Sequence, residues 1–494
     1  MSNPVIIMWF RHDLRLKDNP ALFHAVDIAQ NGTVDGVKAH ILPIFIQDES
    51  APQQAQLGGA SKWWLHQSLE SLSHSTDNAL QLFSGEPLAI LQALIAEHNV
   101  THVLWNRCYE PWQITRDSNI KSQLKQQNIE VLSCNGHLLW EPMQVLKKDN
   151  TPYKVFTPYY RKGCLTRTEP RYPQYLDLMN IDWSRDVSVD HCEIAQLGLL
   201  PDIHWHDTIE KMWQPGEQGA ADRLATFIAG ASGQYRDDRN IPAVTGTSLL
   251  SPYLHFGEIS INTVWYALKD AYANDPDNAH CDTYLSELGW REFSHYLLFH
   301  FPHIPTENFN TKFNTFVWRN DPQDLQAWQR GQTGIPIVDA GMRELYQTGY
   351  MHNRVRMIVG SFLVKNLLVD WREGERWFWD CLLDADMAAN SASWQWVAGS
   401  GADASPYFRI FNPILQGEKF DKQGDYVKRY CPELRKLPPK FIHQPWEAPN
   451  NILNACDVVL GHNYPKPLVD LKVSRQRALD TFAKSKEDAL NANS

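Results

Sequence analysis

Three clusters in the second half of the chain combine residue types at spacings that suit ligand binding. In the first, Glu287, Trp290 and Arg291 follow one another at helical spacing and share one helix face. A carboxylate, an indole and a guanidinium on one face can line a pocket for a flat polar ligand. A surface salt bridge beside a core tryptophan has the same pattern, so both interpretations stand on these residues alone.

The second cluster is formed by Asn353, Arg356 and Met357, again at helical spacing. An asparagine amide can make two hydrogen bonds to the edge of a base or an imide, and a methionine can pack against the ligand's apolar side. An ordinary amphipathic helix that turns its arginine to solvent is the alternative.

The third cluster places Asp384 and Asp386 just before Asn390. Two carboxylates buried without partners are costly or shift their pKa, so we expect Arg356, Arg409 or a ligand to pair with them. A metal site is the competing interpretation. It is disfavoured because no histidine lies nearby and the spacing offers only two oxygen ligands.

A loop of hydroxyl residues precedes an expected helix at residues 246–253. Hydroxyl groups and backbone N–H groups at the start of a helix suit phosphate binding, although serine and threonine are also ordinary helix caps. The residues concerned are Thr247, Ser248, Leu249, Leu250 and Ser251.

The elements that must position these clusters fall into two classes. Over the first 136 residues, short apolar runs alternate with amphipathic stretches, which predicts a doubly wound parallel α/β domain. The expected strands are 5–10, 40–45, 79–83, 102–105 and 130–133, and two of the expected helices are 61–73 and 87–98. The fingerprint GxGxxG and a Walker A loop are both absent after the first strand.

The rest of the chain is mostly helical in pattern. Residues 137–215 are irregular and predict an interdomain connection that packs along the surface. Residues 216–480 predict an all-α domain, with a helix start at Ser260, and residues 481–494 form a polar tail. The fold class is therefore an α/β domain followed by an all-α domain.

Composition excludes several classes of protein. With 494 residues, 43% hydrophobic and 21% charged, the chain can bury a large core and is not disordered. Eight scattered cysteines argue against a disulfide framework, and the chain predicts a soluble cytoplasmic protein without a signal peptide or membrane span. The net charge is −11, but residues 280–445 carry 18 basic against 19 acidic residues, so a cationic face there is possible.

Taken together, these motifs resemble the photolyase/cryptochrome family, and the match runs from residue 5 to about 470. Its motifs are the run from Phe10 to Pro20 and, in the helical domain, 246–251, 287–293, 353–357, 371–376, 394–412 and 417–420. The details are similar to the bacterial class III photolyases, which are close to plant cryptochromes.

The resemblance implies that FAD lies in the helical domain and a light-harvesting antenna in the α/β domain. It implies FAD contacts from Tyr235, the loop 247–251, Tyr284, Arg291, Arg356, Asp384 and Asp386. Asn390 takes the place that faces flavin N5, where a neutral amide can support the fully reduced anionic flavin. Plant-type cryptochromes carry aspartate there, so Asn390 favours repair over signalling.

The resemblance also implies the substrate, a cyclobutane pyrimidine dimer in DNA, flipped out of the stack at a cost of a few kcal/mol. Glu287 and Asn353 would bind the bases, Trp290 and Trp396 would stack on them, and Met357 would contact the dimer. Relatives that act on (6-4) photoproducts use a histidine pair where this chain has His352 and Asn353. The DNA backbone would be contacted by Arg239, Arg354 and Gln416.

Three tryptophans, Trp394, Trp371 and Trp318, match the family's chain for photoreduction of the flavin. Core packing is the alternative for any one of the 19 tryptophans. Glu110 matches a residue that contacts a methenyltetrahydrofolate antenna in part of the family. Ser391, Ala392 and Ser393 depart from the asparagine and glycine common in better-known repair enzymes.

The predicted activity is that of a deoxyribodipyrimidine photolyase, a carbon–carbon lyase that acts as a monomer on damaged DNA with FAD and without a metal. A blue-light receptor of the cryptochrome type is the alternative, although the residues after the last motif-like stretch, 474–494, are short for a signalling tail. A dark flavin oxidoreductase is disfavoured because no nicotinamide motif is present.

Overall fold

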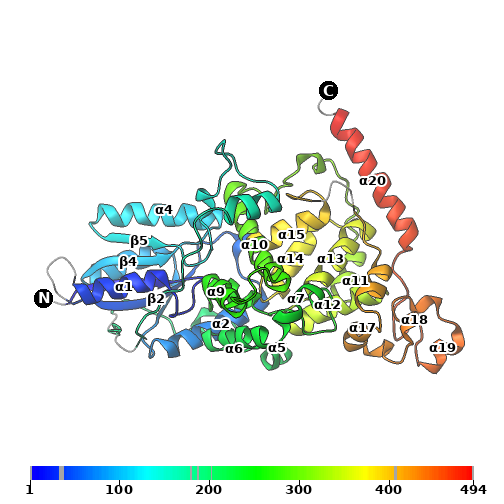
Figure 1. The fold of residues 1–494 in the computed structure, drawn as a ribbon, viewed down its shortest axis with the longest axis horizontal. Coiled ribbons are helices and arrows are strands. Elements are labelled where there is room, and N and C mark those ends of the chain that lie inside the picture. The colour runs from blue at the N-terminus through cyan, green and yellow to red at the C-terminus, as the bar shows by residue number, and fades with distance from the viewer. Residues whose placement is uncertain are drawn as a thin grey trace. The chain divides into compact units, whose positions relative to one another are not determined.

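The computed structural model describes residues 3–32, 38–178, 181–185, 188–201, 203–404 and 409–491. The chain divides into two compact units (Figure 1). Unit 1 comprises Met1–Tyr153, Thr157–Gly230 and Ser248–His300, and unit 2 comprises Lys154–Phe156, Ala231–Thr247 and Phe301–Ser494.

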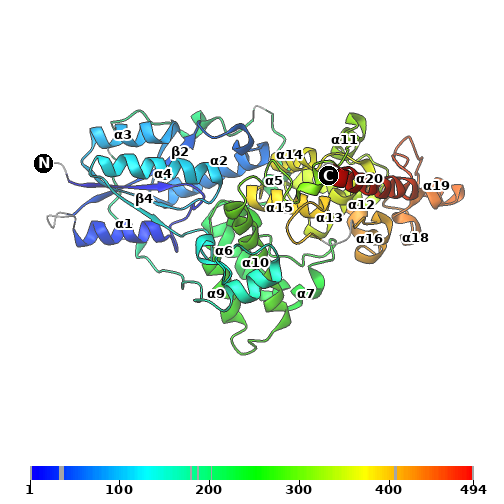
Figure 2. The ribbon, with the colours of Figure 1, turned by 90° about the horizontal axis from the view of Figure 1, so that it is seen from above.

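Unit 1 is built around a five-stranded parallel sheet in the order β3-β2-β1-β4-β5. In Figure 2, α1 (Pro20–Asn31) lies on one face of the strands, and α3 (Pro87–Glu97) and α4 (Pro111–Gln126) lie on the other. Because helices cover both faces, all six residues of β1 are buried. The prediction of a doubly wound sheet is confirmed, and the strands are β1 (Val5–Phe10), β2 (His40–Asp48), β3 (Gln81–Gly85), β4 (Val100–Asn106) and β5 (Glu130–Cys134).

The strand order reverses at β1, whose neighbours are β2 and β4, and the polar residues of this sheet gather where these strands end. Arg11, just after β1, donates a 2.6 Å hydrogen bond to Asp117 of α4. Arg116, also on α4, donates at 2.6 Å to Asp48 at the end of β2. In doubly wound sheets such ends form the ligand-binding edge, and the loop from β4 to α4, which carries Glu110, lies at this edge.

The long connection is more deeply embedded than its composition predicts. Tyr159 and Tyr160, in the short π-helical turn η3 (Pro158–Cys164), are each only 1% exposed. This part of the connection belongs to the core of unit 1 instead of the surface, because two aromatic rings here pack against helix α10.

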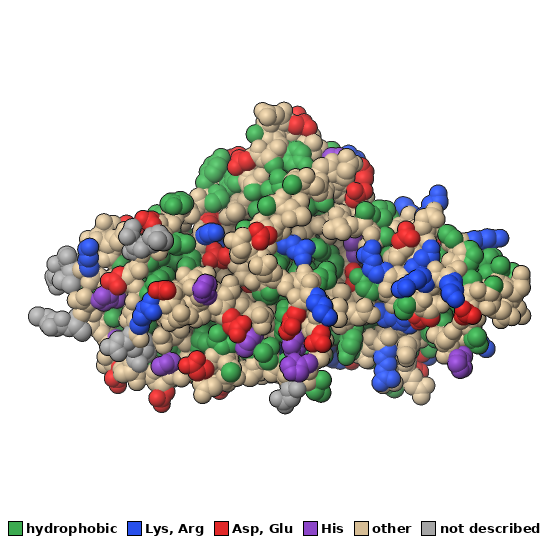
Figure 3. Space-filling view, turned by 90° about the horizontal axis from the view of Figure 1, so that it is seen from below, with side chains coloured by type: hydrophobic (Ala, Val, Ile, Leu, Met, Phe, Trp, Pro, Cys, Tyr) green, Lys and Arg blue, Asp and Glu red, His purple; other side chains and the backbone are tan. Residues whose placement is uncertain are grey.

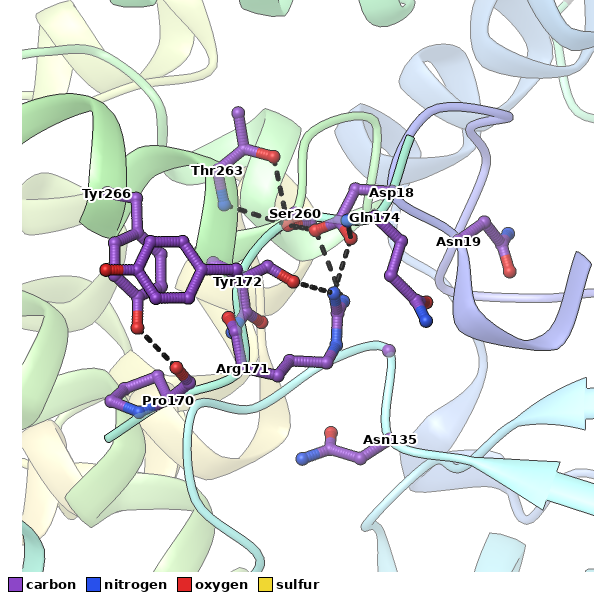
Figure 4. A network of polar contacts seen from close by, with 12 residues as sticks. Asp18, Asn19, Asn135, Pro170, Arg171, Tyr172, Gln174, Ser260, Thr263 and Tyr266 are labelled. Atoms are coloured by element: carbon purple, nitrogen blue, oxygen red, sulfur yellow. Dashed lines mark hydrogen bonds and ion pairs between the residues drawn. The ribbon is translucent and has the colours of Figure 1, made fainter. Parts of the chain in front are cut away.

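The connection is also held by a buried carboxylate (Figure 4). Asp18 accepts hydrogen bonds from the guanidinium of Arg171, from the backbone N–H of Gln174 at 2.7 Å and from the hydroxyl of Ser260. Because a buried carboxylate is costly without donors, this set of contacts fixes the strap 171–174 to the sheet domain and to the start of α9. Ser260 caps α9, as predicted, by accepting from the N–H of Thr263 at 3.0 Å.

The remaining helices of unit 1 follow the expected helical pattern. The longest is α10, whose 22 residues carry four of the predicted site residues, Tyr284, Glu287, Trp290 and Arg291. The helices are α2 (Gly59–Ser75), α5 (Asp207–Met212), α6 (Glu217–Ala229), α8 (Ser251–His255), α9 (Ile261–Ala271) and α10 (Ala279–His300), with 3₁₀ turns η1 (Gln53–Ala55), η2 (Pro142–Gln144) and η5 (Ile194–Leu197).

Unit 2 is helical throughout its described part, which confirms the predicted all-α class. A single large apolar cluster joins α12, α13, α14 and α15 around Trp328, Trp371 and Trp394. The helices are α7 (Tyr235–Asp238), α11 (Pro322–Gln329), α12 (Pro336–Thr348), α13 (Asn353–Ser361), η8 (Phe362–Leu367), α14 (Trp371–Cys381), α15 (Met387–Ala398), α16 (Pro413–Phe420), α17 (Asp425–Tyr430), α18 (Pro439–Ile442), α19 (Asn450–Ala455) and α20 (Leu471–Asn491), with short turns η6 (Ala231–Gln234), η7 (Thr311–Phe313), η9 (Pro432–Leu434) and η10 (Pro445–Glu447).

The segment predicted as a polar tail is largely helical, since α20 continues through residue 491. Over the described residues, no helix combines the length and the apolar character that a membrane crossing requires.

Candidate functional site

The first turn of α13 presents the second of the three clusters. His352 caps this helix, because its Nδ1 accepts the backbone N–H of Arg354 at 3.2 Å. Burial lowers the pKa of His352 to about 4, and the nearby arginines 354, 356 and 239 act in the same direction, so the ring is neutral. The cap places exposed Asn353 and half-buried Met357 one turn apart, at the predicted spacing.

The same helix also carries one member of a half-buried ion pair. The Arg356 guanidinium donates to both carboxylate oxygens of Asp384, at 3.1 and 2.9 Å, and its Nε donates to the carbonyl of Met351 at 2.7 Å. Burial acts to lower the pKa of Arg356, but Asp384 outweighs it and the pKa is raised. The sequence-based expectation that Asp384 pairs with Arg356 is confirmed.

Asp386 has a different role in the fold from its neighbour. Its carboxylate accepts the backbone N–H of Ala389 at 2.7 Å and so caps α15. This cap satisfies one of the free N–H groups at the start of the helix and sets where Asn390 and Trp394 emerge from α15.

Asn390 is held by α14. Its Nδ2 donates a 3.0 Å hydrogen bond to the backbone carbonyl of Glu375, and the next residue, Ser391, donates its hydroxyl to Glu375 Oε1 at 2.6 Å. Burial raises the pKa of Glu375 to about 7, while the Ser391 hydroxyl acts to lower it. Because one N–H of the amide is committed to Glu375, the amide oxygen and the second N–H are the groups that can face a ligand.

The three predicted electron-transfer tryptophans range from buried to half-buried. Trp394 on α15 is 3% exposed and Trp371 on α14 is fully buried, with its Nε1 donating to Asn308 at 3.1 Å. Trp318 is half-buried and packs 4.5 Å from the ring of Phe316. Trp394 and Trp371 are therefore interior residues, and Trp318 is the most exposed of the three.

Arg354 and Arg239 are the cations that the resemblance assigns to DNA, and both lie in unit 2. Arg354 donates to the amide oxygen of Asn240 at 2.5 Å, lies 4.6 Å over the ring of Phe420 and contacts the Met357 sulfur at 3.7 Å. Arg239 lies 5.6 Å over the ring of Tyr235. Half-buried Gln416 is on α16, in the helix that also carries Phe420, and half-buried Trp396 is on α15.

Unit 1 carries most of the other residues predicted to contact FAD. The hydroxyl of Tyr284 on α10 donates to Ser248 at 3.0 Å, and burial raises the pKa of this phenol. Leu249 has a φ of 55°, so the loop turns sharply before Ser251 begins α8. Helix α8 has only five residues, so its dipole is a minor attraction for a phosphate. The hydroxyls and the backbone N–H groups of the loop are the main groups that this segment can offer. Thr247, in unit 2, lies 3.5 Å from the hydroxyl of Tyr350.

The Glu287 cluster is also on α10, where Glu287 and Trp290 are half-buried and Trp290 packs against Phe293 at 5.9 Å. Arg291, predicted to contact FAD, donates to the carbonyl of His137 at 3.0 Å and lies 2.8 Å from its Nε2. Arg291 thus contacts the connection, and it also pairs with the neighbouring Glu292 at 3.2 Å.

Glu110, the predicted antenna residue, precedes α4. Its carboxylate accepts the indole N–H of Trp112 at 2.6 Å. A negatively charged group next to an aromatic ring suits a flat ligand that carries amide and amine donors.

The structure thus brings together Asn353, Arg354 and Met357 in one set, and Arg356 with Asp384 in another. Sequence reasoning missed Glu375, which lies inside a quoted motif but faces α15, and His137, whose contact with Arg291 spans 154 residues. Neither contact has a local pattern in the sequence. In the ranges that the structure describes, no group of three or more histidine, cysteine or acidic side chains could hold a metal ion.

Comparison with known families and proteins agrees with this geometry. Residues 6–174 match the DNA photolyase family model, and residues 284–484 match the model of the FAD binding domain of DNA photolyase. A deoxyribodipyrimidine photo-lyase of Agrobacterium fabrum is 47% identical over 98% of this chain and 98% of its own. Cryptochrome-2 of Arabidopsis thaliana is 38% identical over 97% of this chain and 79% of its own.

A solved structure shows the same architecture over nearly the whole length. The crystal structure of a bacterial class III photolyase from Agrobacterium tumefaciens is 46% identical, with a TM-score of 0.92, and the match covers 99% of this chain and 98% of that one. This level of identity and coverage shows that the chain belongs to the photolyase/cryptochrome family.

Proposed function

We propose that the chain is a deoxyribodipyrimidine photolyase, which uses light and reduced FAD to split cyclobutane pyrimidine dimers in DNA. The observation that carries the proposal is the first turn of α13. There exposed Asn353 and half-buried Met357 offer base-edge and apolar contacts, and Arg356 of the same helix is held by Asp384. Similarity to curated photo-lyases along nearly the entire chain supports it.

The chemistry of the donor set fits FAD. A flavin needs donors and acceptors at the edge of its ring, and hydroxyls and N–H groups at its phosphates. Unit 2 offers Arg356, Asp384 and the amide oxygen of Asn390 for the ring and ribityl chain. Unit 1 offers Tyr284 and the loop 248–251 for the phosphates, and Tyr235 and Thr247 add to them. When bound and photoexcited, reduced FAD supplies the electron that opens the dimer and takes it back afterwards.

The protein's own residues orient the two reactants. Asp384 holds the Arg356 guanidinium in one position through two hydrogen bonds. Glu375 holds the amide of Asn390, whose oxygen can accept a hydrogen bond from the flavin. Glu287 and Asn353 hydrogen-bond the bases of the flipped dimer, and Trp290 and Trp396 replace the stacking that flipping removes. Arg239, Arg354 and Gln416 hold the flanking backbone.

We further propose a methenyltetrahydrofolate antenna at Glu110 and a monomeric, cytoplasmic enzyme. The carboxylate of Glu110, which accepts the indole N–H of Trp112, supports the antenna, because it is a negatively charged group next to an aromatic ring. The match of the chain to the DNA photolyase model over residues 6–174 supports an antenna in this half of the molecule.

The proposal is tested by comparing the rate of dimer repair by the wild-type protein with that of the variant Glu287→Ala. Purified protein under blue light should restore the 260 nm absorbance of a dimer-containing oligonucleotide, and Glu287→Ala should slow this about tenfold to hundredfold. That range corresponds to the loss of one desolvated hydrogen bond, about 1–3 kcal/mol. FAD content should not change. Asp282→Ala is the matched control, because Asp282 lies on the same helix but is exposed and paired with Arg161 on the surface.

A wild-type protein that binds FAD but shows no recovery at 260 nm beyond a dark control overturns the repair function. That result, together with normal photoreactivation in a deletion strain, would instead support a photoreceptor. The similarity to cryptochrome-2 of Arabidopsis thaliana favours this second function, whereas Asn390 in place of aspartate favours repair.

A further inference from the structure

Unit 2 contains a buried carboxyl that the proposed site does not use. Many acidic side chains lie at the surface, where water solvates their charge, as the red side chains in Figure 3 show. Glu344 on α12 is instead only 6% exposed. Burial raises its pKa to about 7, while hydrogen bonds from Tyr426 and His352 and the charge of Arg356 act to lower the pKa. A carboxyl is costly to bury, so the groups that it contacts indicate what it does.

Three hydrogen-bond donors converge on Glu344. Its Oε2 accepts the hydroxyl of Tyr426 at 2.6 Å and the backbone N–H of His352 at 3.2 Å. Its Oε1 accepts the hydroxyl of Tyr430 at 3.4 Å. Both tyrosines belong to α17, and His352 is the residue just before α13. This carboxyl of α12 therefore joins the start of α13 to α17.

His352 is the residue from which α13 starts. Its carbonyl accepts the backbone N–H groups of Val355 at 2.8 Å and of Arg356 at 3.0 Å. In a capping box, a glutamate or glutamine at the third helical position accepts the N–H of the capping residue. Here that position is Val355, which is apolar and fully buried. Glu344 supplies the same contact from another helix, so the start of α13 depends on α12.

The peptide group between Met351 and His352 is held from both sides. Its carbonyl oxygen accepts the Nε of Arg356 at 2.7 Å, and its N–H donates to Glu344. Arg356 is itself fixed by Asp384. Only residues 349–352 lie between the end of α12 and the start of α13. Because this loop is so short, a rotation of the peptide group moves the first turn of α13 with it.

We propose that Glu344 is a positioning residue for dimer recognition. By fixing the N–H side of this peptide group, it sets where Asn353 and Met357 lie, which are the residues proposed to contact the bases and the dimer. The inference rests on the proposed function and deepens it, because it adds a residue that acts on the dimer only through the α13 turn. Loss of the Glu344 contacts should therefore weaken binding of the dimer and leave the rate of repair of bound dimer unchanged.

The test compares two matched tyrosine variants of the holoenzyme. Y426F removes the hydroxyl that donates to Glu344, and Y464F removes a hydroxyl that donates at 2.8 Å to Asp339, another buried carboxyl of α12. Both should lose similar stability, since each lacks one buried hydrogen bond. Only Y426F should raise the Kd for a dimer-containing duplex, by about threefold to tenfold, with kcat at saturating duplex and light within about twofold of wild type. Equal Kd values for Y426F and Y464F overturn the proposal.

Substitutions of Glu344 itself separate its hydrogen bonds from its volume. E344L fills the space but leaves the His352 N–H without this acceptor, so the Kd should rise about tenfold to thirtyfold. E344Q keeps an acceptor oxygen and should restore the Kd to within about threefold of wild type. FAD content should match wild type in both variants, because Arg356 remains paired with Asp384. A wild-type Kd in E344L, or a Kd in E344Q as high as in E344L, contradicts the positioning role.

Hydrogen exchange separates failure of this inference from failure of the proposed function. Exchange in a peptide spanning residues 348–357, measured by mass spectrometry, should be faster in E344L than in wild type or Y464F, because the His352 N–H loses its acceptor. Unchanged exchange in E344L overturns the inference. A wild-type protein that binds dimer-containing and undamaged duplex equally overturns the proposed function instead, and the exchange rates still decide whether Glu344 holds the α13 turn.

Discussion

At the scale of single residues, hydrogen bonds decide what a site side chain can offer. Trp371 is a clear case, because its indole N–H is committed to the buried amide of Asn308 at 3.1 Å while the Arg372 guanidinium lies 4.5 Å over its ring. The ring can therefore serve packing and electron transfer together. Replacing Trp371 removes both roles at once. A second substitution that removes only the hydrogen bond to Asn308 is therefore needed to separate the effect on stability from the effect on electron transfer.

Trp371→Phe should stop photoreduction of oxidised FAD but spare repair once the flavin has been reduced chemically. It should also cost about 1–3 kcal/mol of stability, since Asn308 loses its partner. Asn308→Ala keeps the indole and removes the same hydrogen bond, so it should lose comparable stability and retain photoreduction. Flavin absorbance during illumination and urea unfolding measure the two effects, and undiminished photoreduction in Trp371→Phe would remove this residue from the path.

Glu375 gives a second prediction, from its titration. Its pKa is raised by burial to about 7, against about 4.3 in the unfolded chain. The carboxyl therefore stays protonated to a higher pH in the folded state than in the unfolded chain. Its contribution to the free energy of unfolding is complete below about pH 4 and is lost as pH rises to about 7. The loss is on the order of 3 kcal/mol.

Glu375→Gln should accordingly become more stable relative to wild type as pH rises from 5 to 7.5, since the amide cannot titrate and can still accept from Ser391. Glu373→Gln, two residues earlier on α14 and paired with Arg376 at the surface, should follow the wild-type pH dependence. Thermal denaturation across this range measures both. Parallel curves for wild type and Glu375→Gln would show that Glu375 is ionised throughout.

At the scale of elements, the contact of α14 with α15 positions Trp394 and depends on a glycine. A Cβ on Gly374 would lie 2.1 Å from Cη2 of Trp394, which is closer than side chains tolerate, whereas a Cβ on Gly360 would lie 3.5 Å from Cζ3 of the same ring. The two glycines approach one indole from α14 and α13. Only the first approach requires the absence of a side chain.

Gly374→Ala should therefore displace the Trp394 ring and destabilise unit 2 by about 1–3 kcal/mol, the usual cost of overpacking a core. Gly360→Ala should change stability by less than about 1 kcal/mol, because tight contact and improved helix propensity oppose each other. Urea denaturation gives the free energies, and the rate of flavin photoreduction reports the ring position. Equal effects of the two substitutions would contradict the packing argument.

The elements themselves were largely predictable from the sequence. Strand β1 (Val5–Phe10) matches its expected range, and the others differ by only a few residues, because buried parallel strands are continuous apolar runs. Ser260 and the pair of Arg356 with Asp384 were also foreseen. The buried part of the connection was not predicted, because its aromatic residues follow neither a helical nor a strand period.

The candidate site was predictable only where its contacts are local. Asn353 and Met357 are one helical turn apart, so their spacing places them. The contact of Ser391 with Glu375 joins two helices, and that of Arg291 with His137 joins α10 to the connection. Such contacts depend on how elements pack, which periodicity does not specify.

At the scale of the whole molecule, the two halves of the proposed function separate along the sequence. The proposed antenna residue Glu110 lies between β4 and α4 of the sheet domain, whereas the Asn390 amide and the α13 turn belong to unit 2. If light harvesting and repair are distinct, a substitution at the antenna site of the sheet domain should change which wavelengths drive repair. It should leave the repair chemistry itself intact.

Glu110→Gln should weaken binding of methenyltetrahydrofolate, because it removes the charge that attracts a cationic or N–H-rich ligand, while the amide oxygen can still accept from Trp112 and preserve the loop. The protein, reconstituted with FAD and the folate, should then lose its near-ultraviolet band and the repair driven there, and repair under blue light should equal wild type. Glu86→Gln is the matched control, since Glu86 is a glutamate at the start of another helix of the same sheet, α3. A near-ultraviolet band of full strength in Glu110→Gln would place the antenna elsewhere, and loss of blue-light repair would show that the two halves are not separable.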